Sequence, residues 1–372
     1  MENYIKLFFE CLIIDVTRKC NLKCAHCFAG DAQNVSISKR VIDIVLSQLE
    51  GVGLLVLSGG EPFLEPDMVE YIVDQIIEKK IYIPIFEVIT NGTVQDVRGA
   101  LAMRKMAEYT YKFGGTCAVY VSDDKWHKES PLYDAEKTVQ FYKSICGDKA
   151  RVEIKPEDIL PEKHSYVYSG RAVNLPVSDE YGIRFENGFH RIGIDKFLDN
   201  YNALSIQCYM EITVDGKLKL GSMVSYELCD KMELHTVEEY SLYNLIRMWN
   251  KEHPLTCQES KEYIVKPLND FHAGVITKEE YNKKIESIGY LIELRKTLLE
   301  LNPDMTFAQC QEATKSMIGL TPSQCKIQQM VILMAHGGLF RSTEEIVTQS
   351  REDKVIATNY KSAMQYLDIY GY

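Results

Sequence analysis

Three cysteines near the amino end have the residue type and spacing to hold a metal group. Cys20, Cys24 and Cys27 lie in the run Cys-Asn-Leu-Lys-Cys-Ala-His-Cys. Iron–sulfur cubanes usually take four thiolates, one for each iron, so three clustered thiolates leave one iron open. A metal binds substrate or cofactor at an open coordination position, whereas closed sites are structural. The spacing therefore predicts an iron–sulfur centre with one vacant position.

The residues alone leave other uses of these cysteines open. A zinc site needs four ligands, and His26, the neighbour of Cys27, would have to supply one of them. A redox CXXC pair would use Cys24 and Cys27 and would leave Cys20 without a role. A c-type haem needs a histidine after the second cysteine of the pair, and His26 lies inside it, so haem is nearly excluded.

Strand-like and helix-like segments alternate over the first 155 or so residues. Ser36 or Ser38 is expected to cap the first helix, and Asp67 lies in the first turn of the second. The alternation predicts a parallel sheet with right-handed crossovers. The predicted strands are 12–16, 54–58, 82–90, 117–121 and 151–155, and the predicted helices are 36–50, 66–80, 95–112 and 132–146.

Further polar motifs follow the predicted strands, as the cysteines do. Gly59-Gly60-Glu61-Pro62, Thr90-Asn91-Gly92-Thr93 and Ser122-Asp123-Asp124 each come directly after an apolar run. Working residues gather at the carboxyl ends of parallel strands. The first two motifs could also be plain turns, and Asp123 or Asp124 could cap a turn. His127 is the titratable acid/base candidate of this segment, with a solvated side chain as the alternative.

Composition limits the function classes. The chain has 372 residues, enough for two or three domains, and a net charge of −11, which disfavours general nucleic-acid binding and anionic membranes. Its 11 cysteines are too sparse for a disulfide scaffold, and reduced thiols fit the cytosol. The N-terminus lacks a signal peptide, and no stretch reaches the length of a transmembrane helix. We expect a soluble cytoplasmic protein.

The CX3CX2C motif after a strand, with GGEP after the next strand, carries a family resemblance. Over residues 11 to about 175, and weakly to 250, the chain resembles the radical S-adenosylmethionine (SAM) enzymes. The resemblance implies an α/β fold, a partial (β/α)6 barrel, with a small twitch-like β-hairpin module and a helical C-terminal region. It also implies a [4Fe–4S] cluster on Cys20, Cys24 and Cys27, and SAM on the open iron.

The resemblance further implies which side chains lie near SAM. The GGEP segment would bind the methionine part, with Glu61 accepting hydrogen bonds from the ammonium group. Arg171 lies in a Gly-Arg-Ala segment that recurs in SPASM and twitch members; a surface ion pair is the alternative reading of this residue. Asp123 and His127 are the catalytic candidates. The residues expected near SAM are His26, Phe28, Gly59, Gly60, Glu61, Thr90, Asn91, Ser122, Asp123, Lys155 and Arg171.

A β-hairpin is predicted at 206–226, with Asp215-Gly216 as its turn. Its first strand carries Cys208, and the run from this residue resembles the start of a SPASM or twitch auxiliary-cluster module. The cysteine expected after the turn is missing, and four thiolates for a second cubane are not apparent. Cys208 and Cys229 are therefore expected to be ordinary buried thiols.

The chain is expected to have three parts: a barrel at 1–195, a hairpin module with a helix at 196–255, and a helical domain at 256–372. A sixth strand is predicted near 191–195, a helix near 236–250, and mostly helices from 258. Thr321 is expected to cap a helix whose first residue is Pro322. Met317, Met330, Met334 and Tyr366 are expected in the core, with a partner-binding groove as the alternative.

The mechanism that the resemblance implies begins with an electron from flavodoxin or ferredoxin. SAM is cleaved to methionine and a 5′-deoxyadenosyl radical, which removes hydrogen from a substrate carbon. The hairpin favours a ribosomally made peptide as substrate, with a cross-link, thioether or epimerisation as product. A nucleotide, sugar or amino acid is the alternative substrate. Because Cys20 lies so near the start, we expect no N-terminal leader-binding domain.

A rival from another class is a non-catalytic iron–sulfur electron carrier or sensor. Such a protein would have no need of an ammonium acceptor at Glu61, so this residue separates the two hypotheses.

Overall fold

The computed structural model describes residues 5–156, 164–167, 169–175, 181–184, 190–198, 201–220 and 224–336. The chain divides into two compact units. The first holds residues 1–188 and 192–248, and the second holds residues 189–191 and 249–372. The three-part division with boundaries after residues 195 and 255 stays a prediction.

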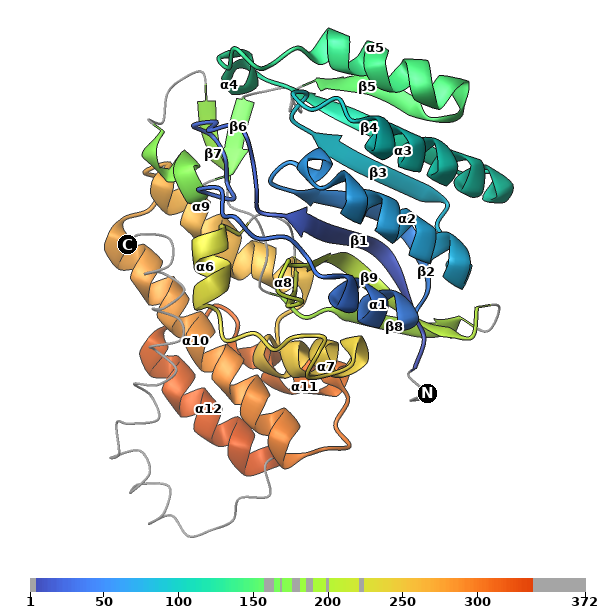
Figure 1. Cartoon of the computed structure of the whole chain (residues 1–372). Coiled ribbons are helices and arrows are strands. Elements are labelled where there is room, and N and C mark those ends of the chain that lie inside the picture. Colours follow the sequence, from blue (N-terminus) through green and yellow to red (C-terminus); the bar gives the residue numbers. More distant parts are fainter. Residues whose placement is uncertain are drawn as a thin grey trace. The chain divides into compact units, whose positions relative to one another are not determined.

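The first unit is built on one open, mostly parallel sheet. Its strands run in the order β10-β9-β1-β2-β3-β4-β5, and β8 pairs with β9 off this path (Figure 1). Strands β1 to β5 are each parallel to the next, as the alternating pattern predicted. Their bounds are β1 Leu7–Thr17, β2 Leu49–Gly59, β3 Ile85–Thr90, β4 Thr116–Asp123 and β5 Arg151–Pro156.

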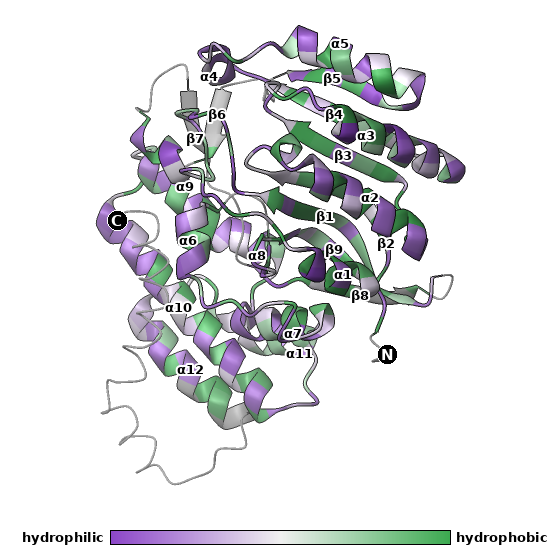
Figure 2. Cartoon of the chain, viewed as in Figure 1, coloured by the Kyte–Doolittle hydropathy of each residue, from purple (hydrophilic) through white to green (hydrophobic). Residues whose placement is uncertain are grey.

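Helices connect these strands and bury apolar side chains. Ser38, one of the two predicted caps, accepts a hydrogen bond from the backbone N–H of Val41, while Ser36 forms a bridge with Thr17. Asp67 lies in the first turn of the second helix, as predicted. The strands are largely hydrophobic and the helices present both polar and apolar residues (Figure 2). The main helices are α1 Lys39–Ser47, α2 Pro66–Lys79, α3 Val97–Thr110 and α5 Ala135–Cys146.

The predicted hairpin is confirmed, but its first strand also extends the main sheet. β9 (Ala203–Ile212) and β10 (Leu218–Leu220) pair antiparallel, and Gly216 has a φ of 78° in the turn between them. On its other edge β9 pairs parallel with β1. The predicted sixth strand is β8 (Gly193–Leu198), which is antiparallel to β9. The hairpin therefore belongs to the same sheet as the predicted barrel strands.

Short elements follow β5 and the hairpin. β6 (His164–Val167) and β7 (Tyr181–Arg184) form a separate two-stranded parallel sheet, in a segment where the sequence pattern was irregular. A single 3₁₀ turn, Gly170–Asn174, lies between them in the sequence. Helix α6 (Tyr226–Lys231) follows the hairpin and begins at Ser225, whose side chain accepts a hydrogen bond from the Leu228 N–H. No sequence signal predicted this helix.

The second unit is helical in its described part. The core packs side chains of α10, α11 and α12 together, including Leu294, Leu298 and Cys310. Threonine capping boxes start α8, α10 and α11. The bounds are α7 Leu242–Glu252, which begins in the first unit, α8 Cys257–Ser260, α9 Lys266–His272, α10 Lys278–Leu301, α11 Phe307–Thr314 and α12 Pro322–His336.

Two predictions for the C-terminal helices can be checked. α12 begins at Pro322, and Thr321 donates from both its N–H and its hydroxyl to Gln324, so the predicted helix start is confirmed. Met317 is buried in the core, as predicted. The side chains of Met330 and Met334, and all of Tyr366, lie outside the described residues. Among the described residues, none of the helices combines the length and apolar content needed to cross a membrane.

Candidate functional site

The predicted site residues meet because β1, β2, β3 and β4 are parallel and end on one edge of the sheet. The segment between β1 and α1, residues 18–38, is called the cysteine loop below. Backbone hydrogen bonds between Arg18 and Val35, and between Gln33 and Arg18, close this loop at its base. The hydroxyls of Thr17 and Ser36 lie 2.9 Å apart at the same place. The loop is therefore a closed structure whose ends are held by the strand.

The three thiols of the cysteine loop are half-buried and free. The N–H of Cys27 donates to the carbonyl of Cys24 at 3.2 Å, and Asn91 Nδ2 donates to the sulfur of Cys20 at 3.6 Å. Burial raises the pKa of Cys20 and of Cys27 above the ordinary thiol value. Arg171 opposes this effect at Cys27. Cys20 and Cys27 therefore lose their protons readily only when a cation or a metal lies close to the sulfur.

Gly59–Glu61, called the GGE turn below, holds the beginning of the cysteine loop. The N–H of Gly60 donates to the carbonyl of Thr17 at 2.6 Å, and the N–H of Glu61 donates to the carbonyl of Lys19 at 2.8 Å. A Cβ on Gly59 or Gly60 would come well inside 3.0 Å of these carbonyls. The two glycines therefore allow a close approach of the chain's own backbone.

The Glu61 side chain joins the GGE turn to the end of β3. It is fully buried, and its carboxylate accepts hydrogen bonds from the N–H of Phe63 at 3.1 Å, the hydroxyl of Thr90 at 2.9 Å and the N–H of Asn91 at 2.7 Å. Burial raises the pKa of Glu61 to about 7 despite these donors. Of these three donors, Asn91 binds Oε2 and the other two bind Oε1, so Oε2 can accept a further hydrogen bond.

The Thr90–Thr93 corner at the end of β3 also contacts the cysteine loop. Asn91 Nδ2 donates to Asn21 Oδ1 at 2.9 Å, and the side chains of Asn21 and Thr93 lie 2.7 Å apart. Gly92 has a φ of 77°, the left-handed turn geometry that an Asn-Gly pair favours. The segment is thus a turn, and its polar side chains fix Asn21 beside Cys20.

Asp124 caps a short helix after β4, as one of the alternatives predicted. Its Oδ1 accepts from the N–H of Trp126 and of His127 at the start of α4 (Lys125–Lys128). Asp123 accepts a hydrogen bond from the Tyr133 hydroxyl at 2.6 Å. The same hydroxyl reaches the carbonyl of the half-buried Ser122 at 3.0 Å. The strand end is therefore ordered by its own polar groups.

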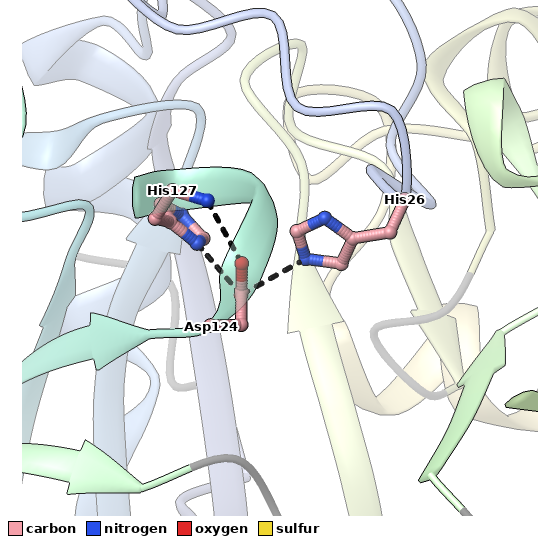
Figure 3. A group of neighbouring side chains, drawn as sticks. All are labelled: His26, Asp124 and His127. Atoms are coloured by element: carbon pink, nitrogen blue, oxygen red, sulfur yellow. Dashed lines mark hydrogen bonds and ion pairs between the residues drawn. The ribbon is translucent and has the colours of Figure 1, made fainter. Parts of the chain in front are cut away.

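His26, Asp124 and His127 form a bridge between the cysteine loop and α4 (Figure 3). Asp124 Oδ2 lies 3.2 Å from His26 Nε2 and 2.6 Å from His127 Nδ1. Figure 3 shows both rings directed toward this carboxylate from opposite sides. The His26 ring stacks on Trp126 with centroids 4.3 Å apart, and its Nδ1 is buried without a hydrogen-bond partner.

Asp124 and His127 shift each other's pKa within this bridge. Burial alone would lower the pKa of His127, but Asp124 and Cys24 beside it raise the value to about 9. Burial alone would raise the pKa of Asp124, but hydrogen bonds from His127 and His26 lower it below its usual range. The side chain of His127 is 12% exposed and paired, so the solvated alternative is wrong. Catalysis by Asp123 or His127 stays a prediction.

Gly170–Ala172, called the GRA turn below, holds the far side of the cysteine loop. The N–H of Arg171 donates to the carbonyl of Cys27 at 2.9 Å. Its guanidinium donates to the carbonyls of Cys24 at 3.0 Å and Gly30 at 2.6 Å. An ion pair with the exposed Asp31 is present as well, at 3.0 Å. The ion pair predicted as the alternative is real, but it is one of four contacts, and the other three are made to loop carbonyls.

Two predicted SAM contacts lie at the margins of this arrangement. Lys155 is the last residue but one of β5 and lies beside Ser122 in the register, with its Nζ 5.8 Å from the ring centroid of Tyr120. Phe28 is half-buried within the cysteine loop, and its carbonyl faces Gly170. Their placement near SAM stays a prediction.

Sequence reasoning missed a buried charged group on the strands next to the loop. Lys219 and Glu211 are opposite each other on β10 and β9, at 2.7 Å, with side chains 3% and 4% exposed. Asp15 on β1 lies beside Glu211, and burial together with that neighbour raises its pKa well above the usual range. A charged residue inside the apolar run Leu-Ile-Ile-Asp-Val was the available signal.

A single metal ion fits the cysteines poorly in the arrangement that the structure describes. Zinc, at about 2.3 Å from each sulfur, would draw three thiolates to within about 4 Å of one another. Among the described residues, the three side chains with ligand atoms within 4.8 Å of one another are His26, Asp124 and His127, not the cysteines. His26, which a zinc site would need, is engaged with Asp124.

The two cysteines of the predicted hairpin module lie apart from this loop in the sequence. Cys208 is half-buried on β9 and Cys229 is buried in α6. Burial raises the pKa of Cys229 to about 11. Whether they bind an auxiliary cluster stays a prediction.

Comparison with solved structures finds low overall similarity. A structure described as native anSMEcpe with bound AdoMet and Cp18Cys peptide is 18% identical, with a TM-score of 0.38, covering 64% of this chain and 80% of that one. Streptococcus suis SuiB bound to precursor peptide SuiA is 13% identical, with a TM-score of 0.33, covering 66% of this chain and 65% of that one.

Sequence comparison points to one family over the strands that carry the site. The uncharacterized protein MJ0907 of Methanocaldococcus jannaschii is 37% identical over 67 residues, which are 17% of this chain and 23% of that protein. This chain thus spans less than a quarter of that relative's length. The family model of the Radical SAM superfamily matches residues 14–122, which run from the end of β1 to the end of β4. Residues 14–122 of this chain are therefore similar to the radical SAM superfamily.

Proposed function

We propose that this chain is a radical SAM enzyme whose cluster is held by Cys20, Cys24 and Cys27. The observation that carries the proposal is the cysteine loop itself, in which three free thiols follow the end of β1, a strand parallel to β2. With a [4Fe–4S] cluster and SAM bound, this chemistry supplies a 5′-deoxyadenosyl radical that removes hydrogen from a substrate carbon. The protein contributes position and shelter from water.

The side chains around the loop support this role by fixing its geometry. The GGE turn and Asn91 hold the segment of Cys20, while the GRA turn holds that of Cys24 and Cys27. Oε2 of Glu61 retains the acceptor capacity that an ammonium group would use. We propose that SAM lies against His26, Phe28, Gly59, Gly60, Glu61, Thr90, Asn91, Ser122, Asp123, Lys155 and Arg171.

We infer that the substrate is a ribosomally made peptide and the product a cross-link, thioether or epimer. The β9–β10 hairpin, which resembles a twitch module in sequence, supports this choice. The electron would come from flavodoxin or ferredoxin, and the proposed location is the cytoplasm. Incubating the enzyme with short peptides encoded beside its gene should alter one of them in a SAM-dependent way. A cross-link or thioether lowers the mass by two hydrogens, whereas an epimer keeps its mass and is detected by the deuterium that it takes up in D2O. An unaltered peptide together with a changed nucleotide, sugar or amino acid would overturn the peptide assignment.

Anaerobic reconstitution tests the reaction class. The protein is loaded with iron and sulfide and then given SAM and dithionite, and 5′-deoxyadenosine is quantified by chromatography. We expect 5′-deoxyadenosine from the wild type and none from Cys24→Ala, which should also lose the absorbance of the cluster. Cys117→Ala is the matched control, because this buried thiol lies in β4 and contacts the carbonyl of Met103. A fully loaded cluster that yields no 5′-deoxyadenosine would instead favour an electron carrier or sensor.

A further inference from the structure

Arg171 is placed to organise the cysteine loop, apart from any contact that it makes with SAM. We propose that Arg171 is a positioning residue that holds the Cys24–Gly30 segment in its metal-binding shape before any metal arrives. The proposal depends on the function proposed above only for the identity of the group that the cysteines hold.

The first support is the number of loop carbonyls that one residue reaches. Arg171 Nε donates to the carbonyl of Cys24 at 3.0 Å, and Nη1 donates to that of Gly30 at 2.6 Å. Its backbone N–H donates to the carbonyl of Cys27 at 2.9 Å. These contacts join residues more than 140 positions apart in the chain. One arginine therefore fixes both ends and the middle of the Cys24–Gly30 segment.

The second support is the close backbone packing beside Arg171. Gly170 has a φ of 57°, and a Cβ there would collide with the backbone of Phe28 and Gly30. On the same side, the N–H of Tyr226 donates to the carbonyl of Ala29 at 2.9 Å. The neighbouring N–H of Ser225 donates to the Ser169 hydroxyl at 3.0 Å. The segment thus lies against two turns that come from distant parts of the sequence.

An arginine suits this position because its donors are spread over a rigid plane. Nε and Nη1 of one guanidinium serve two carbonyls at the same time, and charge-assisted bonds of this kind are stronger than neutral ones. A lysine keeps the charge but presents a single nitrogen on a flexible stem. Lys and Gln substitutions therefore separate the loss of the planar fork from the loss of charge.

Hydrogen–deuterium exchange of the iron-free protein tests the inference. Mass spectrometry follows peptides that cover the cysteine loop in wild type, Arg171→Lys and Arg171→Gln. The matched control is Arg98→Gln, which removes an exposed arginine of α3 whose partners are Asp67 and Glu70. A peptide from β3 reports whether the sheet itself stays intact. Iron bound per chain after reconstitution is the second measurement.

We expect amides within 24–30 to exchange roughly ten times faster in both Arg171 variants, the change that loss of one charge-assisted hydrogen bond produces. Amides near Cys20 and in β3 should keep the wild-type rate, because the GGE turn and Asn91 hold that part. The amount of iron bound per chain should be highest in the wild type, lower in Arg171→Lys and lowest in Arg171→Gln. Arg98→Gln should match the wild type in every peptide.

Wild-type exchange at 24–30 in both Arg171 variants would overturn the proposal. So would equally faster exchange throughout the loop and β3, because Arg171 would then support the whole unit. If the Arg171→Gln protein does not fold, the exchange rates of Arg171→Lys still test the proposal, because this variant keeps the positive charge. The exchange measurement involves neither iron nor SAM, so absence of SAM cleavage would count against the proposed function and leave this result standing.

Discussion

The GGE turn and the GRA turn hold the same cysteine loop by different means. The GGE turn uses backbone N–H groups that meet the carbonyls of Thr17 and Lys19, and it is continuous with the central strand β2. The GRA turn uses a long side chain in addition to one backbone N–H, and it lies in a 3₁₀ turn outside the main sheet. The cysteine loop is thus bound to the sheet by backbone hydrogen bonds on one side, and on the other side it is held mainly by the Arg171 side chain.

This difference separates two kinds of contribution. Contacts that belong to the sheet support both the fold and the site, because β1 and β2 are also part of the hydrophobic core. Contacts made by a peripheral turn support the site with little effect on the core. Substitutions in the GGE turn should therefore lower stability and metal binding together, whereas those in the GRA turn should chiefly lower metal binding.

Gly60→Ala should have the largest effect. The added Cβ would collide with the carbonyl of Lys19, and neither backbone can move without breaking the hydrogen bonds that join the GGE turn to the loop. We expect a loss of roughly 3 to 5 kcal/mol in the free energy of unfolding and no stable cluster. Chemical denaturation and iron analysis measure the two effects. Gly289→Ala, in helix α10 with open space around it, is the control and should be neutral or stabilising. A Gly60→Ala protein with wild-type stability would remove the basis of the comparison.

Gly170→Ala should come next. Its Cβ would meet the backbone of Phe28 and Gly30, and its φ of 57° disfavours any residue with a side chain. The short 3₁₀ turn can shift more easily than a central strand, so we expect a stability loss of roughly 1 to 3 kcal/mol. Iron content should nevertheless fall as far as it does in Gly60→Ala. Equal losses of stability in the two variants would show that the turns do not differ as argued.

Glu61→Gln should make the contribution of residue 61 to the free energy of unfolding independent of pH. Burial raises the pKa of Glu61 from 4.5 to about 7, so between these values the native state holds a proton that the unfolded state has released. This contribution to stability is complete below pH 4.5 and is lost as the pH rises through 7. The amide should also cost roughly 1 to 3 kcal/mol, because it turns a donor toward Phe63 or Asn91.

The measurement is denaturation of iron-free wild type and Glu61→Gln at several values between pH 5 and 8. We expect the gap between the two proteins to shrink as the pH rises, since the wild type alone loses stability through this group. A gap that is constant with pH would contradict the raised pKa of Glu61.

The sequence predicted the part of the site that depends on local patterns. Apolar runs followed by Cys20, Gly59, Thr90 and Ser122 put these residues at strand ends, and parallel strands brought them to one edge. Turn chemistry likewise identified the hairpin at Asp215-Gly216. Each of these features is specified within a few neighbouring residues.

Contacts between residues far apart in the chain could not be predicted from these local patterns. Arg171 was expected near SAM, but no local pattern encodes its contacts with Cys24 and Gly30. The pairing of β9 with β1 and the burial of Glu211 against Lys219 also depend on tertiary packing. Glu61 is a further example. The sequence indicated that its carboxylate would accept hydrogen bonds, but it did not indicate that the donors would be Phe63, Thr90 and Asn91.

Ser169→Ala should have the smallest effect, and it tests how the GRA turn itself is held. The Ser169 hydroxyl accepts from the N–H of Ser225, directly before Tyr226, which donates to the loop carbonyl of Ala29. Losing one hydrogen bond in this chain should cost about 1 kcal/mol and speed iron loss to a chelator a few-fold. Ser144→Ala, on the exposed side of α5, removes a hydroxyl that serves only its own helix and is the matched control. If both variants lost iron at the wild-type rate, the start of α6 would be a neighbour of the GRA turn without supporting it. The cysteine loop would then depend on Arg171 and Gly170 alone on that side.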